Sequence, residues 1–141
     1  MKIAMKEYNE IINTICNLYH EAAVKLGLSD SEMDILYGLC SHGQGCYQSI
    51  LYKETGMTKS TINSAIKKME RDEILYLTPG PGRNTCVHLT EKGQKLAERT
   101  VYKVFEIENV IYGGWSEEEQ QTFLRLNRNF AETLEQLIKK L

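Results

Sequence analysis

Residues 59–71 bring short hydroxyl and amide side chains together with cations. The polar positions of this segment are Lys59, Ser60, Thr61, Asn63, Ser64, Lys67, Lys68 and Arg71. Short donors and acceptors suit base edges and phosphate oxygens, and a lysine or arginine suits the phosphate charge. Serine, threonine and asparagine are poor helix formers, whereas an ordinary solvated helix, the alternative interpretation, favours Glu, Lys and Ala. The residue types therefore indicate a surface that binds double-stranded DNA.

A helix over these residues would carry the polar side chains on its outer face. A buried stripe is predicted by apolar residues at i, i+3, i+4 and i+7, namely Ile62, Ala65, Ile66 and Met69. Thr58 is a suitable N-cap, because its hydroxyl can accept from a free backbone amide of the first turn. Residues 48–55 suit a short helix, and Gly56 can adopt the left-handed conformation that ends it. This order predicts a helix-turn-helix. Tyr52 is bulky for the close crossing of its two helices.

A β-hairpin is predicted directly after this helix. Residues 74–78 and 85–89 are rich in β-branched, aromatic and aliphatic side chains, and the PGPGRN between them is turn chemistry. Arg83 lies at the tip, where a guanidinium can enter a minor groove of negative potential. The alternative is a solvated arginine at a loop tip. A helix for the major groove followed by such a wing is the order of parts in a winged helix-turn-helix.

In these motifs, the chain resembles the MarR family of transcriptional regulators, and the resemblance covers nearly its whole length. The motifs are STINSAIKKMERDEIL, similar to the family's recognition helix, and the arginine-bearing wing that ends in LTEKG. The resemblance implies a mainly α fold with a minor α+β part. It implies a winged helix-turn-helix at residues 29–89, and dimerisation helices at 1–28 and 90–141, in one domain of residues 1–141.

The resemblance also implies residue roles. By analogy, Ser60, Thr61, Asn63, Ser64 and Lys67 match groove-facing positions, and Arg83 matches the wing arginine. Two features depart from the family pattern. Glu73 replaces the glycine that usually closes the recognition helix, and the short wing lacks the paired Asp/Arg pattern that supports the tip. The implied function is a repressor that binds a pseudo-palindromic operator as a homodimer.

The flanking segments are predicted to be helical. Near the N-terminus, an apolar seam at alternating spacings of four and three consists of Tyr8, Ile12, Ile15, Tyr19, Ala22 and Leu26. Ser29 with Glu32 forms a possible capping box for a helix to about residue 40, and 42–45 is a loop. Thr90 caps a long helix to about residue 112, and Ser116 with Glu119 opens the last one. Its stripe is Phe123, Leu126, Phe130, Leu134, Leu137 and Leu141. A homodimer or packing within a monomer could bury these seams.

Some residues are candidates for binding a small-molecule effector or for sensing oxidants. The family often binds an aromatic acid as effector, and Tyr19, His20, Tyr37 and Trp115 could line such a pocket or could be core or surface. Cys16 resembles the reactive thiol of the peroxide-sensing branch, because His20 lies four residues later and could lower its pKa. An inert cysteine is the alternative. No cofactor is expected, and no metal site, since the three histidines are widely separated.

Composition agrees with this class of protein. The net charge of the 141 residues is −2, but residues 47–99 hold nine Lys/Arg against six Asp/Glu. No catalytic Ser/His/Asp set, phosphate-binding glycine loop or HExxH motif is present, so we expect no enzyme. With no signal peptide or membrane span, and four cysteines lacking CxxC spacing, we expect a cytoplasmic protein with reduced thiols. A winged helix that binds only proteins remains the rival interpretation.

Overall fold

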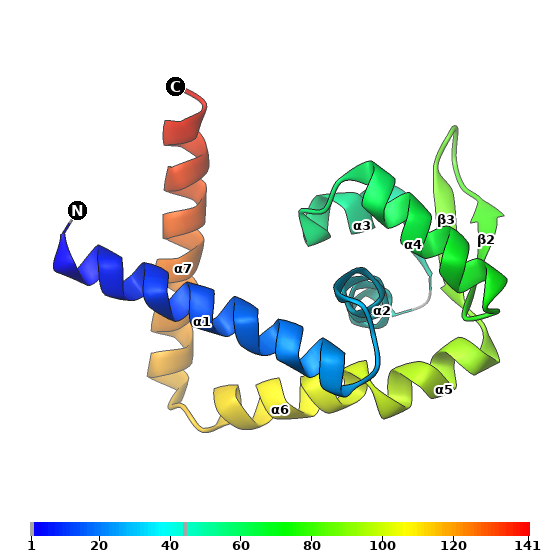
Figure 1. The fold of residues 1–141 in the computed structure, drawn as a ribbon. Helices are drawn as coiled ribbons and strands as arrows, with labels where there is room; N and C mark the ends of the chain where they lie inside the picture. The colour runs from blue at the N-terminus through cyan, green and yellow to red at the C-terminus, as the bar shows by residue number, and fades with distance from the viewer. Residues whose placement is uncertain (1, 44) are drawn as a thin grey trace. The chain divides into compact units, whose positions relative to one another are not determined.

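The computed structural model describes residues 2–43 and 45–141, and its elements fall into two compact units. The first unit ends at Val104 and the second begins at Phe105. In chain order the first unit holds α1 (Ile3–Lys25), α2 (Asp30–His42), β1 (Cys46–Tyr47), α3 (Gln48–Thr55), α4 (Lys59–Arg71), β2 (Leu75–Pro79), β3 (Thr85–Leu89) and α5 (Glu91–Arg99). Helix α6 (Val101–Gly113) crosses the boundary, and α7 (Glu117–Ile138) belongs to the second unit (Figure 1).

The helix-turn-helix forms as the sequence predicts. The Thr58 hydroxyl accepts from the Thr61 amide, and Gly56 ends α3 in the left-handed conformation at φ 66°. The four apolar residues of the α4 stripe are all buried, in a core with Ile35, Leu36 and Leu39 of α2. Because α2 packs against both α3 and α4, it fixes the angle at which α4 shows its polar face.

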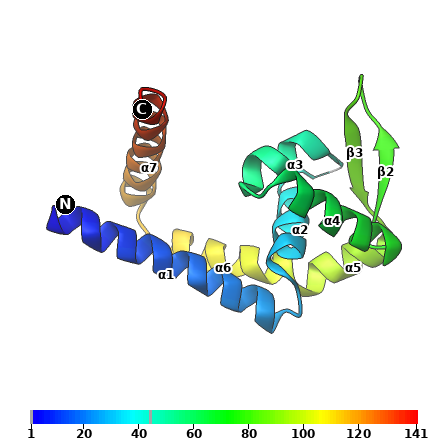
Figure 2. The ribbon, with the colours of Figure 1, turned by 45° about the horizontal axis from the view of Figure 1, so that its top comes forward.

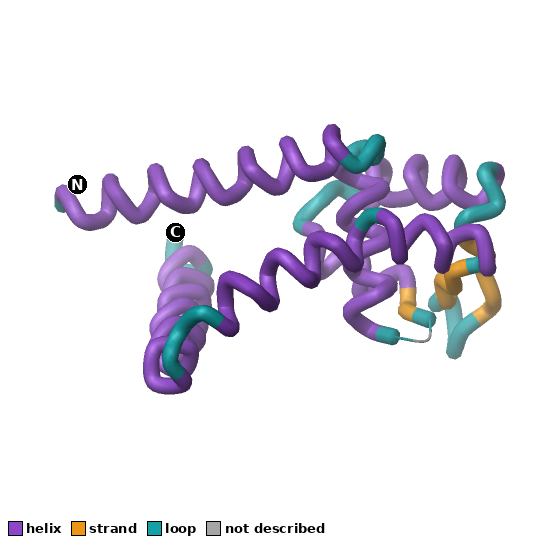
Figure 3. The backbone as a smooth tube through the Cα atoms, turned by 90° about the horizontal axis from the view of Figure 1, so that it is seen from below, coloured by secondary structure: helices purple, strands orange, loops and turns teal. Residues whose placement is uncertain are grey.

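The wing is a hairpin within a three-stranded antiparallel sheet of order β1-β3-β2. Figure 3 shows the strands in orange. Pairing runs from Leu75 opposite Leu89 to Pro79 opposite Thr85. The first strand of the hairpin, β2, starts one residue later than predicted. The reason is that the Ile74 amide still donates to the Met69 carbonyl and closes the last turn of α4. The two-residue strand β1 was not predicted. It follows the predicted loop at 42–45, of which His42 is helical and Gln44 lies outside the described residues.

Two predicted elements need correction. The long helix expected after Thr90 is two helices, because Thr100 between α5 and α6 has φ −127° and ψ −91°. Thr100 is buried, and its hydroxyl donates to the Leu96 carbonyl, a local bond that competes with regular helix geometry. At α2, the Ser29 hydroxyl accepts from the Glu32 amide as expected. The Glu32 carboxylate, however, binds Lys68 of α4 at 2.7 Å instead of completing a capping box.

The second unit contains the capping box predicted at Ser116. The Glu119 amide donates to the Ser116 hydroxyl, and the Ser116 amide donates to the Glu119 carboxylate. The predicted stripe of α7 is exposed in the single chain: Phe123, Leu126, Phe130, Leu134, Leu137 and Leu141. On α1 the seam residues Ile12, Ile15 and Tyr19 are exposed as well. Large apolar side chains in such numbers mark surfaces that another surface covers.

Glu73, the residue in place of the family's glycine, has a left-handed backbone at φ 59°. A side chain in this conformation costs about 1–2 kcal/mol, whereas glycine loses about 0.5–1 kcal/mol of unfolded-state entropy. We therefore expect Glu73→Gly to raise the free energy of unfolding by about 0.5 kcal/mol, measured by urea denaturation. Glu70→Gly, the same exchange inside α4, should lower it by about 1 kcal/mol. A destabilised Glu73→Gly protein would contradict this prediction.

Candidate nucleic-acid interface

The outer face of α4 exposes every side chain that the sequence assigns to DNA contact on this helix: Lys59, Ser60, Thr61, Asn63, Ser64, Lys67 and Lys68. Figures 1 and 2 place α3 and the β2–β3 hairpin next to this helix. The short side chains gather in its first half. The hydroxyls of Thr58 and Thr61 lie 2.9 Å apart and share a hydrogen bond at the N-cap. This face therefore offers hydroxyl and amide groups flanked by cations.

Lys68 differs from the other α4 lysines because its ammonium is already paired. It lies 2.7 Å from the Glu32 carboxylate and 3.6 Å from Asp72. The hydrogen bond and charge of Glu32, and then Asp72, raise the pKa of Lys68. Its charge is thus partly neutralised within the protein, and its geometry favours tying α4 to α2. Beside it, a groove of about 400 Å³ between these helices is lined by hydroxyls, including Ser29, Ser31, Ser60 and Ser64.

A second groove, of about 690 Å³, lies between α3, the start of α4 and the wing. Three exposed cations reach it, namely Lys53, Lys59 and Arg83. Its other lining residues are Gln48, Ser49, Tyr52, Met57, Asn84 and Thr85. Lys59 and Arg83 were predicted from the sequence as DNA contacts. Gln48, Ser49 and Lys53 were not, because only the folded wing brings α3 to the same groove. These three residues could have been predicted from their positions near the two ends of the first helix of the helix-turn-helix.

The candidate effector residues have separate surroundings. Tyr19 is exposed on α1, and the neighbouring His20 ring nitrogen Nδ1 lies 2.8 Å from the Asp30 carboxylate. Tyr37 of α2 is half-buried against the core. Trp115 belongs to the second unit, where its ring packs edge-on against Phe123 with centroids 4.9 Å apart.

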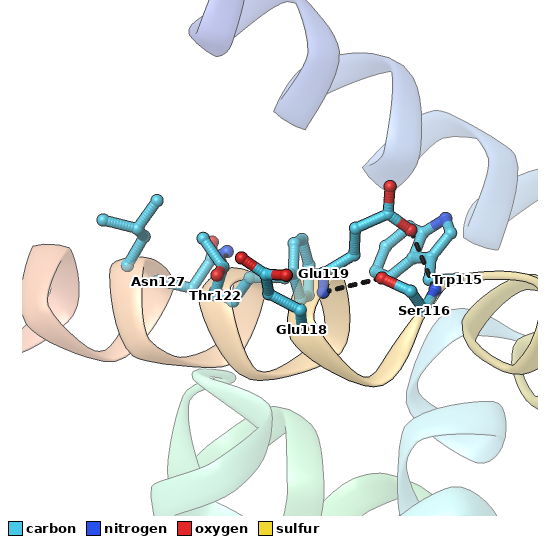
Figure 4. Close-up of a pocket in the computed structure, with 8 residues that line it drawn as sticks. Trp115, Ser116, Glu118, Glu119, Thr122 and Asn127 are labelled. Carbon is cyan, nitrogen blue, oxygen red and sulfur yellow. Dashed lines mark hydrogen bonds between the residues drawn. The ribbon is translucent and has the colours of Figure 1, made fainter.

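The Trp115 surroundings form an open groove of about 700 Å³ on the first turns of α7 (Figure 4). Its lining combines the apolar Phe123 and Leu126 with the carboxylates of Glu118 and Glu119. Two carboxylates beside an aromatic wall disfavour an acidic ligand by like-charge repulsion. Within this unit, the groove is better suited to an apolar or cationic group than to an aromatic acid.

The four cysteines are free thiols, and Cys16 is exposed on α1. The His20 ring, which was expected to activate Cys16, is bound to Asp30. Burial raises the pKa of Cys46, as do the charges of Glu54 and Cys86, and burial raises the pKa of Cys40. These two thiols are therefore poorer nucleophiles than ordinary cysteines. The contact of His20 with Asp30 differs from the contact with Cys16 that the redox hypothesis expects.

In residues 2–43 and 45–141, no helix combines the length and apolar character needed to cross a bilayer. In the same ranges, no three His, Cys, Asp or Glu side chains gather as metal ligands would.

Comparison with known proteins gives consistent results. The sequence profile of the MarR family matches residues 26–83. The HTH-type transcriptional repressor NicR of Pseudomonas putida is 26% identical over 118 residues, which are 82% of this chain and 74% of NicR.

Two solved structures share the fold. NMB1585, a MarR family regulator from Neisseria meningitidis, has a TM-score of 0.86 at 19% identity and covers 99% of both chains. BpsR of Bordetella bronchiseptica, whose DNA binding is regulated by 6-hydroxynicotinic acid, has a TM-score of 0.56 at 21% identity, covering 84% of this chain and 98% of BpsR. The match to the MarR family thus covers the helix-turn-helix and the first wing strand, and over its whole length the chain shares the fold of a MarR family regulator.

Proposed function

We propose that the protein is a repressor that binds a pseudo-palindromic operator as a homodimer. The observation that carries this proposal is the exposed polar face of α4 beside a groove that Lys53, Lys59 and Arg83 line. In this proposal α4 enters the major groove, where short side chains reach base edges, and the wing arginine binds the backbone or minor groove. A two-fold dimer would set its two α4 helices about one DNA turn, roughly 34 Å, apart.

The test is fluorescence anisotropy with DNA from immediately upstream of the protein's own gene, against a scrambled duplex, at two salt concentrations. Preference for the upstream duplex, weakened by salt, would support a specific regulator, because binding releases counterions from several phosphates. Equal affinity for both duplexes would contradict specific recognition at that site. Binding to neither would favour the rival protein-interaction module.

Asn63 and Ser64 lie on the exposed face of α4 and are proposed to contact bases. We expect Asn63→Ala and Ser64→Ala each to weaken binding to the operator by about 1–3 kcal/mol, measured by anisotropy. Affinity for random DNA should change much less, because base contacts carry the sequence information. Equal losses on both duplexes would instead assign the two side chains to the DNA backbone.

Arg83, exposed at the wing tip, is proposed to supply a charge to the DNA. We expect Arg83→Ala to weaken binding about tenfold and to lower the slope of log affinity against log salt by about 0.9, the effect of one lost phosphate contact. Arg128→Ala on α7 removes the same charge outside the proposed interface and is the matched control. Light scattering should give an unchanged molecular weight for Arg83→Ala, and an altered one would contradict the assignment.

We also propose that a small aromatic molecule releases the repressor from DNA. The support is the regulation of the similarly folded BpsR by 6-hydroxynicotinic acid. The candidate contacts in the first unit remain Tyr19, His20 and Tyr37, whereas the carboxylates beside Trp115 in the second unit disfavour an acid there. A ligand that binds the DNA-free arrangement better shifts the population toward it and lowers operator affinity. A panel of hydroxylated aromatic acids, added to the anisotropy assay, tests the proposal, and no displacement by any of them would count against this ligand class.

A further inference from the structure

Asn63, on the exposed face of α4, is held from behind by two residues of α3. The Gln48 amide nitrogen lies 2.5 Å from the Tyr52 hydroxyl and 2.5 Å from the Asn63 carbonyl oxygen Oδ1. The Tyr52 hydroxyl donates to the same oxygen of Asn63. Gln48 and Tyr52 are four residues apart on one helix, so they present their polar ends side by side.

The donors and acceptors of this triad balance. The Gln48 amide nitrogen donates to both Tyr52 and Asn63. Tyr52 accepts one hydrogen bond and donates its only hydrogen to Asn63. Oδ1 of Asn63 thereby accepts two hydrogen bonds, which is the capacity of an amide oxygen. In this arrangement the Asn63 carbonyl oxygen faces α3.

The Tyr52 ring is itself restrained. It is half-buried and packs against the core, and the Lys59 ammonium lies 5.9 Å from its ring centroid. A cation over an aromatic face is attracted to the ring. The Tyr52 hydroxyl is therefore held at Asn63 by packing on one side and by a charge on the other.

The orientation decides what Asn63 offers to a base. Its oxygen is occupied, and within residues 2–43 and 45–141 no partner is recorded for its amide nitrogen Nδ2. An asparagine reads adenine by donating to N7 and accepting from the N6 amino group, which requires the oxygen. Guanine presents two neighbouring acceptors, N7 and O6, to which an N–H group can donate.

We infer that Gln48 and Tyr52 are positioning residues that set the base preference of Asn63, making it a donor that selects guanine over adenine. This inference rests on the proposal that α4 enters the major groove. Adenine at the contacted position would bring its N6 amino group against the Asn63 amino group, two donors facing each other. The discrimination expected from one contact of this kind is about tenfold.

Binding-site selection from a randomised duplex pool tests the inference. Wild-type protein and Asn63→Ala are selected in parallel, and the position where Asn63→Ala loses its preference is the one that Asn63 reads. Wild type should enrich guanine there about tenfold over adenine. In Gln48→Ala/Tyr52→Phe the freed oxygen should let adenine rise to at least equal guanine. Tyr76→Phe, which removes a hydroxyl from the wing strand β2, is the matched control and should keep the wild-type preference.

Two selection results would overturn the inference. Adenine preference in wild type would mean that the Asn63 amide is reversed when bound. An unchanged guanine preference in the double variant would mean that the triad does not set the specificity. A structural role alone predicts lower affinity with the same base preference, so the preference itself is the deciding measurement.

A measurement without DNA separates failure of this inference from failure of the proposed function. Hydrogen exchange of the side-chain amides, followed by NMR, should be several-fold slower for Gln48 than for Asn63, and Asn63→Ala should reduce the protection of Gln48. Slow exchange at Asn63 would overturn the donor arrangement whatever the DNA result. If exchange is as expected and no duplex is selected, the triad stands and the DNA-binding proposal fails.

Discussion

Gly93→Ala is expected to lower the free energy of unfolding by about 3 kcal/mol, a drop in Tm of about 10 °C for a chain of this size. A Cβ at this buried position would lie 1.9 Å from the Ile74 carbonyl oxygen and 3.0 Å from its carbon. Both atoms are backbone, so no side-chain rotation relieves the overlap. The start of α5 must move away from Ile74, or the turn between α4 and β2 must shift.

The corner around Gly93 explains why movement there is costly. The Thr90 hydroxyl accepts from the Gly93 amide at 3.0 Å and donates to the Glu73 carbonyl. The Thr90 amide donates to the Ile74 carbonyl at 3.1 Å. One threonine thus caps α5 and ties it to the turn after α4. Displacing α5 breaks these bonds together, and leaves buried backbone groups unpaired.

Urea denaturation and thermal melting at one fixed protein concentration check this prediction, because self-association makes Tm depend on concentration. Gly113→Ala is the matched control. An added Cβ at Gly113 meets nothing within 4 Å, so this variant should unfold at or slightly above the wild-type midpoint. A Gly93→Ala protein as stable as Gly113→Ala would show that the corner relaxes without cost.

Elements that rest on local rules could be predicted from the sequence. The α4 stripe, the Thr58 and Ser116 caps and the left-handed Gly56 depend on neighbours within one or two turns, and all are confirmed. The break at Thr100 could not be predicted, because apolar spacing continues across it and the break depends on burial of its side chain. β1 has only two residues, which is too short for a detectable alternation of apolar and polar side chains.

The sequence predicts which side chains lie on the exposed face of α4, but not which residues of other elements they contact. Periodicity indicates which α4 side chains point outward, since that needs only the helix geometry. It does not indicate that Glu32, 36 residues before Lys68, would neutralise it. It also does not reveal that Tyr52, which is bulky for the crossing of the two helices, binds Asn63 across the turn. Contacts between elements depend on the packing angle, which the sequence pattern leaves open.

Phe130→Asp is expected to convert the proposed homodimer into monomers. Phe130 lies in the exposed apolar stripe of α7, with Leu126 and Leu134 one turn to either side. If a second copy covers this stripe, each protomer of the variant would bury a carboxylate in place of an aromatic ring. Burying an unpaired charge, and losing an aromatic contact, together should cost about 4 kcal/mol per dimer. The dimer Kd would then rise by about three orders of magnitude.

Sedimentation equilibrium over a range of concentrations measures this change directly. Gln121→Asp is the matched control, because Gln121 is about 2.5 helical turns before Phe130 and so lies on the opposite side of α7. It adds the same charge and should leave the dimer intact. Because two α4 helices must bind together, Phe130→Asp should also lose most of its operator affinity, while its circular dichroism stays helical. A Phe130→Asp protein that remains dimeric would show that this stripe does not join the two copies.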